Sequence, residues 1–167
     1  QNPELICSGE KPKYVVLIIG ESFSKMHSSL YGYSKETNPL LSKLAADSLL
    51  FVCKNSTSAC TKTIPAIKSI MTSYVNEMSD SIDWFKCLTL IEVMQKIDYK
   101  AVWISNHSRE GFFDNEAGCY AALCDYSVFA NERDYYSTYD QVLLPLIEEC
   151  LNGDSTQTFF VVNMLGS

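Results

Sequence analysis

Two side chains suited to chemistry at a phosphate ester stand at the ends of two expected elements. Glu21 follows an unbroken apolar run, residues 15–19, and Gly20 between them permits a sharp turn. Thr63 stands two residues before Pro65, where an apolar helical pattern begins. A hydroxyl at a helix N-terminus meets free backbone N–H groups and the positive end of the helix dipole. That environment stabilises an alkoxide and binds a phosphate or sulfate ester.

Threonine is a poor nucleophile while its hydroxyl is protonated, so Thr63 would need a base or a metal ion. The Glu21 carboxylate is a candidate ligand for such a metal. Both residues also have plain structural explanations, Glu21 as a solvated turn residue and Thr63 as a helix N-cap. The local patterns by themselves favour these plainer explanations.

A second polar group follows the apolar run at residues 100–105. It contains Ser105, Asn106, His107 and Ser108, which could contact a phosphate or a polar headgroup. Ordinary turn chemistry and a surface histidine explain the same residues. Neither His107 nor His27 has a partner at helical metal-ligand spacing, so no helical metal pair is expected.

Alternating apolar runs and amphipathic segments predict how these side chains are positioned. We expect strands at residues 15–19, 49–55, 100–105, 125–131 and 158–165, with the first one central and buried on both faces. We expect helices beginning at residues 37–39 and over 64–74, 88–99 and 137–152, the last kinked at Pro145; residues 111–124 fit helix or irregular chain.

This order predicts an α/β fold in which a mostly parallel sheet carries helices on both faces. Right-handed crossovers then place Glu21 and residues 105–108 at one edge of the sheet.

Size and charge limit the classes of partner. A chain of 167 residues is expected to form one domain, and no segment has the pattern of a membrane-spanning helix or signal peptide. The net charge of −7, without a basic run longer than two residues, argues against nucleic acid as a partner.

The seven cysteines match no zinc-finger spacing. Cys53 and Cys150 are expected in the core, and a Cys119–Cys124 disulfide is left open.

Longer motifs carry a family resemblance. VVLIIGES, HSSLYGYSKETNPLLSKL and TSACTKTIPAIKSIMT resemble the phosphoethanolamine transferases of the sulfatase and alkaline-phosphatase-like superfamily. The likeness continues through WISNHSREGFFDN, YSTYDQVLLPLIEECL and FFVVNMLGS. It implies that residues 13–167 are the N-terminal part of a sulfatase-like catalytic domain, incomplete here, after a linker at residues 1–12.

The resemblance implies a mechanism and a location. Zn²⁺ is held by Glu21 and Thr63, and Thr63 is the nucleophile that takes phosphoethanolamine from phosphatidylethanolamine. A lipid A or glycan acceptor then receives the headgroup. Ser108, with Asn106 and His107, is expected to bind substrate. The family works at the periplasmic face of a bacterial inner membrane, held there by N-terminal helices that are missing from this chain.

The chain also departs from the family pattern. An Asp-His pair that completes the zinc site in relatives is absent, and two ligands are fewer than zinc usually has. We therefore expect this chain alone to bind zinc weakly and to be inactive. One alternative is a phosphoglycerol transferase or a sulfatase-type hydrolase, although threonine at position 63 cannot become the formylglycine of a sulfatase. The other is a degenerate, non-catalytic binding domain.

Overall fold

The computed structural model describes residues 8–75, 83–109, 115–131, 139–152 and 156–166. The chain divides into two units, one made of residues 1–21 with 59–167 and the other of residues 22–58. The first unit contains the sheet and most of the helices, and the second contains one α-helix with two short 3-10 turns.

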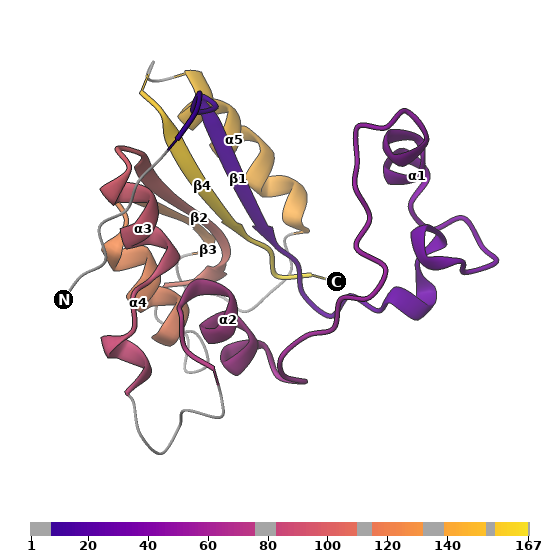
Figure 1. Ribbon diagram of the computed structural model, residues 1–167, viewed down its shortest axis with the longest axis horizontal. Coiled ribbons are helices and arrows are strands. Elements are labelled where there is room, and N and C mark those ends of the chain that lie inside the picture. The colour runs from indigo at the N-terminus through magenta and orange to yellow at the C-terminus, as the bar shows by residue number, and fades with distance from the viewer. Residues whose placement is uncertain (1–7, 76–82, 110–114, 132–138, 153–155, 167) are drawn as a thin grey trace. The chain divides into compact units, whose positions relative to one another are not determined.

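The described sheet has four strands in the order β1-β4-β2-β3. These are β1 (Tyr14–Ile19), β2 (Lys100–Ser108), β3 (Tyr126–Asn131) and β4 (Thr158–Asn163). Every pairing is parallel, and the residues Ile19 and Ser105 both align with Asn163. Figure 1 shows β4 between β1 and β2. The expected parallel sheet is confirmed, and so is the shared edge for the ends of the first strand and of residues 100–105.

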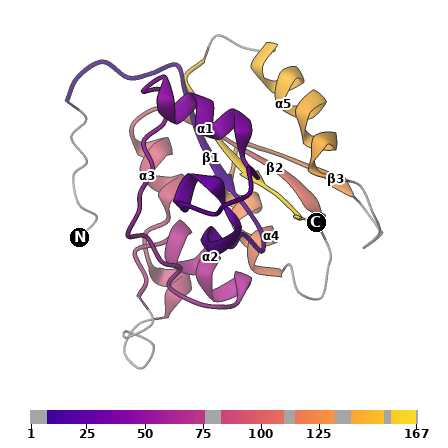
Figure 2. The same ribbon diagram turned by 90° about the vertical axis from the view of Figure 1, so that its right-hand side faces the viewer.

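Helices cover both faces of this sheet, as expected. On one face lie α2 (Thr63–Met71), α3 (Leu90–Lys96) and α4 (Asn115–Leu123), and on the other lies α5 (Leu143–Asn152). Figure 2 shows α5 and α3 on opposite sides of the strands. The alternation along β4 creates this division, since Phe159 and Val161 face one helical layer while Phe160 and Val162 face the other.

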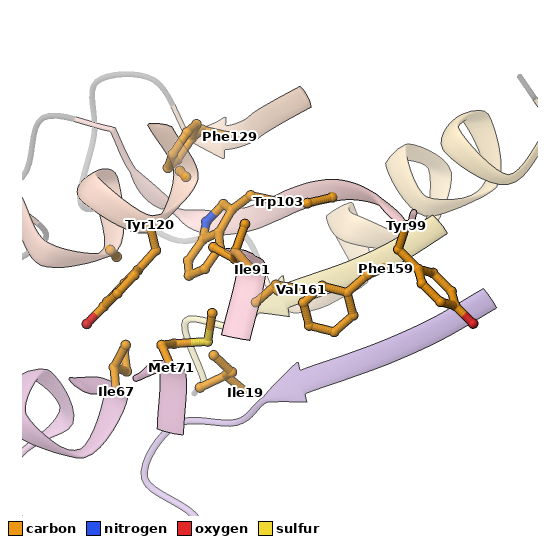
Figure 3. Packing of buried hydrophobic residues seen from close by; sticks show 13 residues of the cluster. Ile19, Ile67, Met71, Ile91, Tyr99, Trp103, Tyr120, Phe129, Phe159 and Val161 are labelled. Carbon is orange, nitrogen blue, oxygen red and sulfur yellow. The ribbon is translucent and has the colours of Figure 1, made fainter. Parts of the chain in front are cut away.

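The larger core lies under α2, α3 and α4. Trp103 is stacked on Tyr120 with ring centroids 6.4 Å apart, and Met71 and Ile91 are fully buried beside them. Figure 3 shows Ile67 and Met71 of α2 reaching toward this cluster, with Ile19 next to them. The core therefore ties the end of β1 and the helix α2 to the same packed layer, which fixes where Glu21 and Thr63 emerge.

The expectation that the first strand is central and buried on both faces is wrong for the described chain. β1 lies at an edge of the sheet, and Val16 and Ile18 are 50% and 62% exposed. The strand buried throughout is β4, whose six residues are all buried. A continuous apolar run therefore identified a strand correctly but not its position, because the run does not show which neighbours the strand has.

The unit of residues 22–58 contains α1 (Pro39–Ala46), which begins where expected, with Asn38 as the N-cap. Asn38 Oδ1 accepts a hydrogen bond from the buried Ser28 hydroxyl at 2.6 Å. The strand expected at residues 49–55 is wrong. The structure describes every residue of this unit, and none forms a strand. An apolar run becomes a strand only when another strand pairs with it.

Helix boundaries differ from the expected ones by a few residues. α3 begins one residue after Thr89, which forms a capping box with Glu92. The open segment at residues 111–124 contains α4, and residues 110–114 lie outside the described chain. Residues 140–142 form a 3-10 turn before α5, so Pro145 stands in the first turn of α5 rather than inside the helix. A first-turn proline lacks only an N–H that has no helical partner, so Pro145 needs no kink.

Among the described residues, no helix combines the length and the apolar character that crossing a membrane requires.

The cysteine expectations are partly wrong. Cys53 is exposed, whereas Cys150 packs at the edge of the α5 core. Cys119 and Cys124 are free thiols in the structure, so the disulfide between them is not formed.

Candidate active site

Glu21 and Thr63 meet at the carboxyl end of β1. The Thr63 hydroxyl donates toward both carboxylate oxygens, with Oγ1 at 3.0 Å from Oε1 and 2.9 Å from Oε2. Both side chains are half-buried. The structure thus brings together two residues that are 42 positions apart, as the sequence analysis expected. Their catalytic and metal-binding roles stay predictions.

The backbone at the end of β1 turns at Ser22 rather than at Gly20. Ser22 has φ 52°, in the left-handed region that residues other than glycine rarely enter, whereas Gly20 is not in that region. Such conformations cost roughly 1–3 kcal/mol and cluster at functional sites. The unfavourable backbone therefore stands directly beside the Glu21 carboxylate.

Thr63 is the first residue of α2 and not its cap. Lys62 occupies the N-cap position, and its side chain makes no capping hydrogen bond. The plain N-cap explanation of Thr63 is therefore wrong, because its hydroxyl donates to Glu21. At the first helical position the hydroxyl still lies at the positive end of the helix dipole, which favours a negatively charged oxygen or a bound anion.

The segment that follows β4, Met164–Gly166, lies against Glu21. Gly166 has φ 80°, and a Cβ added to it would lie 3.0 Å from Glu21 Cβ and 3.3 Å from Glu21 Cγ. The Met164 N–H donates to the Ile19 carbonyl at 3.0 Å, which continues the β1–β4 pairing beyond the strands. A side chain at this point would crowd the Glu21 side chain, which would have to move by a few tenths of an ångström, and would stand on a backbone conformation that favours glycine.

The three substrate-binding residues expected at the end of β2 have different environments. Ser108 is half-buried and follows a register shift in the pairing of β2 with β3, an irregularity often found near active sites. His107 is half-buried, and its Nε2 lies 3.0 Å from the Met164 carbonyl, to which it donates. Asn106 is fully buried, so it has no surface to offer a substrate, and its expected role as a direct contact needs correction.

Asn106 instead belongs to a polar network that the sequence analysis did not predict. Its Nδ2 donates to Asp140 Oδ1 at 2.9 Å, and its Oδ1 accepts from Asn131 Nδ2 at 2.9 Å. Asp140 in turn accepts the backbone N–H groups of Leu165 at 2.8 Å and Gly166 at 3.0 Å. The one available sequence signal was an acidic residue at the start of a helix, which points to the helix dipole and not to a distant segment.

The donor set fits part of a zinc site. A carboxylate and a hydroxyl supply oxygen ligands, and their separation of 2.9 Å lets one ion touch both. Among the described residues, no three His, Cys, Asp or Glu side chains gather closely enough to hold a metal ion. Glu21 and Thr63 therefore suit zinc as two ligands of an incomplete set.

Comparisons with known proteins match the sequence and the fold of this chain to a family. The sulfatase family model matches residues 13–167. The chain is 29% identical over 163 residues to phosphoethanolamine transferase EptC of Escherichia coli. The matched region covers 96% of this chain and 28% of that protein. It is also 29% identical over 164 residues to phosphoethanolamine transferase CptA of Salmonella typhimurium, with the same two shares, 96% and 28%.

A solved structure agrees with the sequence relatives. The crystal structure of the C-terminal periplasmic domain of Escherichia coli EptC, in complex with Zn, matches with a TM-score of 0.84 and 28% identity. The match covers 95% of this chain and 44% of that chain, so this chain spans less than half of the domain. Family model, relatives and fold agree over nearly the same residues, and this chain therefore belongs to the sulfatase family.

Proposed function

We propose that this chain carries the nucleophile and one further zinc ligand of a phosphoethanolamine transferase. The observation that carries the proposal is the contact of the Thr63 hydroxyl with the Glu21 carboxylate at 2.9 Å, at the N-terminus of α2. The family membership and the names of the relatives support the same reaction class.

The proposed first step uses the Thr63 hydroxyl. Zinc, when bound by Glu21 and Thr63, lowers the pKa of the hydroxyl and so makes Thr63 a nucleophile. Thr63 Oγ1 attacks the phosphorus of phosphatidylethanolamine, and the bond between phosphorus and the diacylglycerol oxygen breaks. The hydroxyl proton of Thr63 passes to solvent, the departing diacylglycerol oxygen takes up a proton, and the Glu21 carboxylate stays ionised, as a zinc ligand would have to be. The N–H groups that open α2 face the charge that develops on the phosphoryl oxygens.

In the second step, a hydroxyl or phosphate oxygen of a lipid A or glycan acceptor attacks the phosphothreonine-type intermediate. The bond between phosphorus and Thr63 Oγ1 breaks, and Thr63 regains a proton. Ser108 and His107 lie at the same edge of the sheet as Glu21, and we assign them to substrate contact. We place the reaction at the periplasmic face of a bacterial inner membrane, because the similar Escherichia coli domain is periplasmic.

We further propose that the 167-residue chain alone binds zinc weakly and is inactive. Two oxygen ligands are fewer than the three or four that protein zinc sites use. Activity tests therefore need the full-length protein.

The test measures transfer of a labelled headgroup from phosphatidylethanolamine by the zinc-loaded full-length protein. Thr63→Ala should lower the rate by more than about 1,000-fold, because no other group replaces a lost nucleophile. Thr63→Ser should keep part of the activity. Thr72→Ala is the matched control, because its hydroxyl stands at the other end of α2 and donates to the Lys68 carbonyl at 2.8 Å. Unchanged transfer by Thr63→Ala would remove the assigned nucleophile.

The same assay separates the alternatives. A phosphoglycerol transferase would use labelled phosphatidylglycerol in place of phosphatidylethanolamine, with the same dependence on Thr63. A non-catalytic domain would turn over neither lipid. Glu21→Gln should lower the zinc content of the purified protein, and an unchanged content would take Glu21 out of the ligand set.

A further inference from the structure

Asp140 is a half-buried carboxylate to which the proposed reaction gives no role. Its two oxygens accept three hydrogen bonds, from the Asn106 amide and from the N–H groups of Leu165 and Gly166. Two of these donors belong to one short segment, Met164–Gly166. Asp140 thus holds two consecutive N–H groups, those of Leu165 and Gly166, in the segment that follows the inner strand β4.

Asp140 is itself held from the far side. Asn106 is fully buried, and Asn131 Nδ2 donates to both its carbonyl oxygen at 2.8 Å and its Oδ1 at 2.9 Å. This orients the Asn106 amide so that its nitrogen points to Asp140. When every buried amide has hydrogen-bond partners, the side chains are held in one orientation. Turning any of them would leave a buried polar atom without a partner.

The segment that Asp140 holds is in contact with the candidate active site. Gly166 approaches Glu21 so closely that an added Cβ would lie 3.0 Å from Glu21 Cβ. His107 and Ile19 hold the other end of the segment through the carbonyl and the N–H of Met164. The segment is therefore fixed at both ends and forms one wall beside the Glu21 side chain.

We propose that Asp140 is a positioning residue that fixes Met164–Gly166 and, through Gly166, the Glu21 carboxylate that faces Thr63. Hydrogen-bonded groups behind a metal ligand commonly change metal affinity about 10- to 100-fold when they are removed. The expected effect on zinc rests on the proposed function, whereas the effect on the Glu21 segment does not.

Asp140→Asn is the central variant. An amide keeps one acceptor oxygen and replaces the other by an NH₂ group, which cannot accept an N–H of Leu165 or Gly166. Asp125→Asn is the matched control, because Asp125 Oδ2 also accepts a backbone N–H, that of Ala101 at 2.7 Å. Ala101 lies near the start of β2, at the opposite end of the parallel sheet from Glu21.

Two measurements on the full-length protein decide the proposal. In the zinc-free protein, hydrogen exchange of the segments around Glu21 and around Gly166 should become faster in Asp140→Asn and stay unchanged in Asp125→Asn. In zinc titrations against a competing chelator, Asp140→Asn should bind about 10- to 100-fold more weakly, while Asp125→Asn binds like the wild type. Wild-type exchange around Glu21 in Asp140→Asn would overturn the proposal, and so would wild-type zinc affinity.

The two hypotheses fail in different ways. If the wild-type protein binds no zinc, the proposed function fails, and hydrogen exchange around Glu21 still decides the role of Asp140. If Asp140→Asn does not fold, Asn131→Ala takes its place, because it removes a more distant link of the same network. Asn131→Ala should change both measurements in the same direction by a smaller factor, and wild-type values for it would count against the proposal.

Discussion

Selected polar contacts at the two ends of the parallel sheet differ in the kind of partner that the side chain has. At the amino end, Asp125 accepts the Ala101 N–H at 2.7 Å, and the Tyr99 hydroxyl donates to the Pro12 carbonyl at 2.7 Å. In both of these contacts a side chain bonds to the main chain, although Asp125 Oδ2 also accepts from Gln95 Nε2 at 3.2 Å. At the carboxyl end, Thr63 and Glu21 bond side chain to side chain at 2.9 Å.

The two kinds of contact serve different purposes, one the stability of the fold and the other the chemistry of the proposed site. A side chain that satisfies a main-chain group stabilises the fold, since its loss leaves a backbone donor or acceptor without that partner. The contact of the Thr63 hydroxyl with the Glu21 carboxylate joins two side chains whose oxygen atoms can also bind a metal or a phosphate. Parallel sheets bind ligands at their carboxyl ends, and this chain places the candidate pair Glu21 and Thr63 there. Asp140 combines the two uses, because it bonds to main-chain N–H groups that themselves lie beside Glu21.

Among the variants that test this comparison, Gly166→Ala should have the largest effect on the transfer rate. The new methyl group would lie 3.0 Å from Glu21 Cβ and would stand on a backbone with φ 80°. We expect transfer to fall by about 100-fold, because small displacements of catalytic groups have effects of that size. Gly9→Ala is the control, since Gly9 has φ 107° and open space around it. It should cost stability of about 1 kcal/mol without affecting transfer. Equal transfer rates for the two variants would contradict the close contact with Glu21.

Tyr99→Phe tests the amino end. It removes the hydrogen bond to Pro12 and should lower the free energy of unfolding by about 1 kcal/mol, with no change in transfer or zinc affinity. Urea unfolding measures the first effect, and the transfer assay measures the second. Tyr126→Phe serves as control, because Tyr126 is 48% exposed. A loss of transfer in Tyr99→Phe with unchanged stability would remove the proposed separation between the two ends.

Cys124 provides the smallest test, again at the amino end. Burial, with a smaller contribution from the Asp125 charge, raises the pKa of the Cys124 thiol from 9.0 to about 12. The unfolded chain therefore loses this proton first, and the free energy of unfolding should fall as the pH rises from 9.0 toward about 12. The measurement compares wild type with Cys124→Ala below about pH 9 and at about pH 10.5.

The variant isolates the thiol from the other groups that titrate in alkali. The wild type should lose more stability than Cys124→Ala over this interval, while transfer by the zinc-loaded protein at neutral pH stays equal. Identical losses would show that the folded protein does not hold this proton.

Local sequence patterns predicted most elements of the fold. The apolar run before Gly20 predicted β1, and the mostly apolar run at residues 158–165 predicted β4. The same kind of run failed at residues 49–55, where no strand forms. Local patterns report what a segment can form, whereas pairing depends on which segments become neighbours, as the edge position of β1 also shows.

The candidate site divides in the same way. Glu21 and Thr63 were recognisable because each stands at a predicted element end and because the surrounding motifs resemble one family. Asn106 was misassigned, since a polar residue after a strand looks the same whether it is buried or exposed. The contact between Asp140 and Gly166 was missed, because an acidic residue at the start of a helix points to the helix dipole and not to a segment 26 positions away.

The amino-acid sequence by itself predicts three properties of this protein. These are the α/β fold class, the parallel direction of the strands and the identity of the two side chains most suited to phosphate chemistry. Periodicity, turn residues and motif spacing are local, so they can be read along the chain. Two other properties depend on the folded chain. β4 rather than β1 is the buried centre, and Gly166, held by Asp140, lies against the Glu21 side chain. Burial and hydrogen-bond partners are properties of neighbours in space, and folding selects those neighbours from distant parts of the chain.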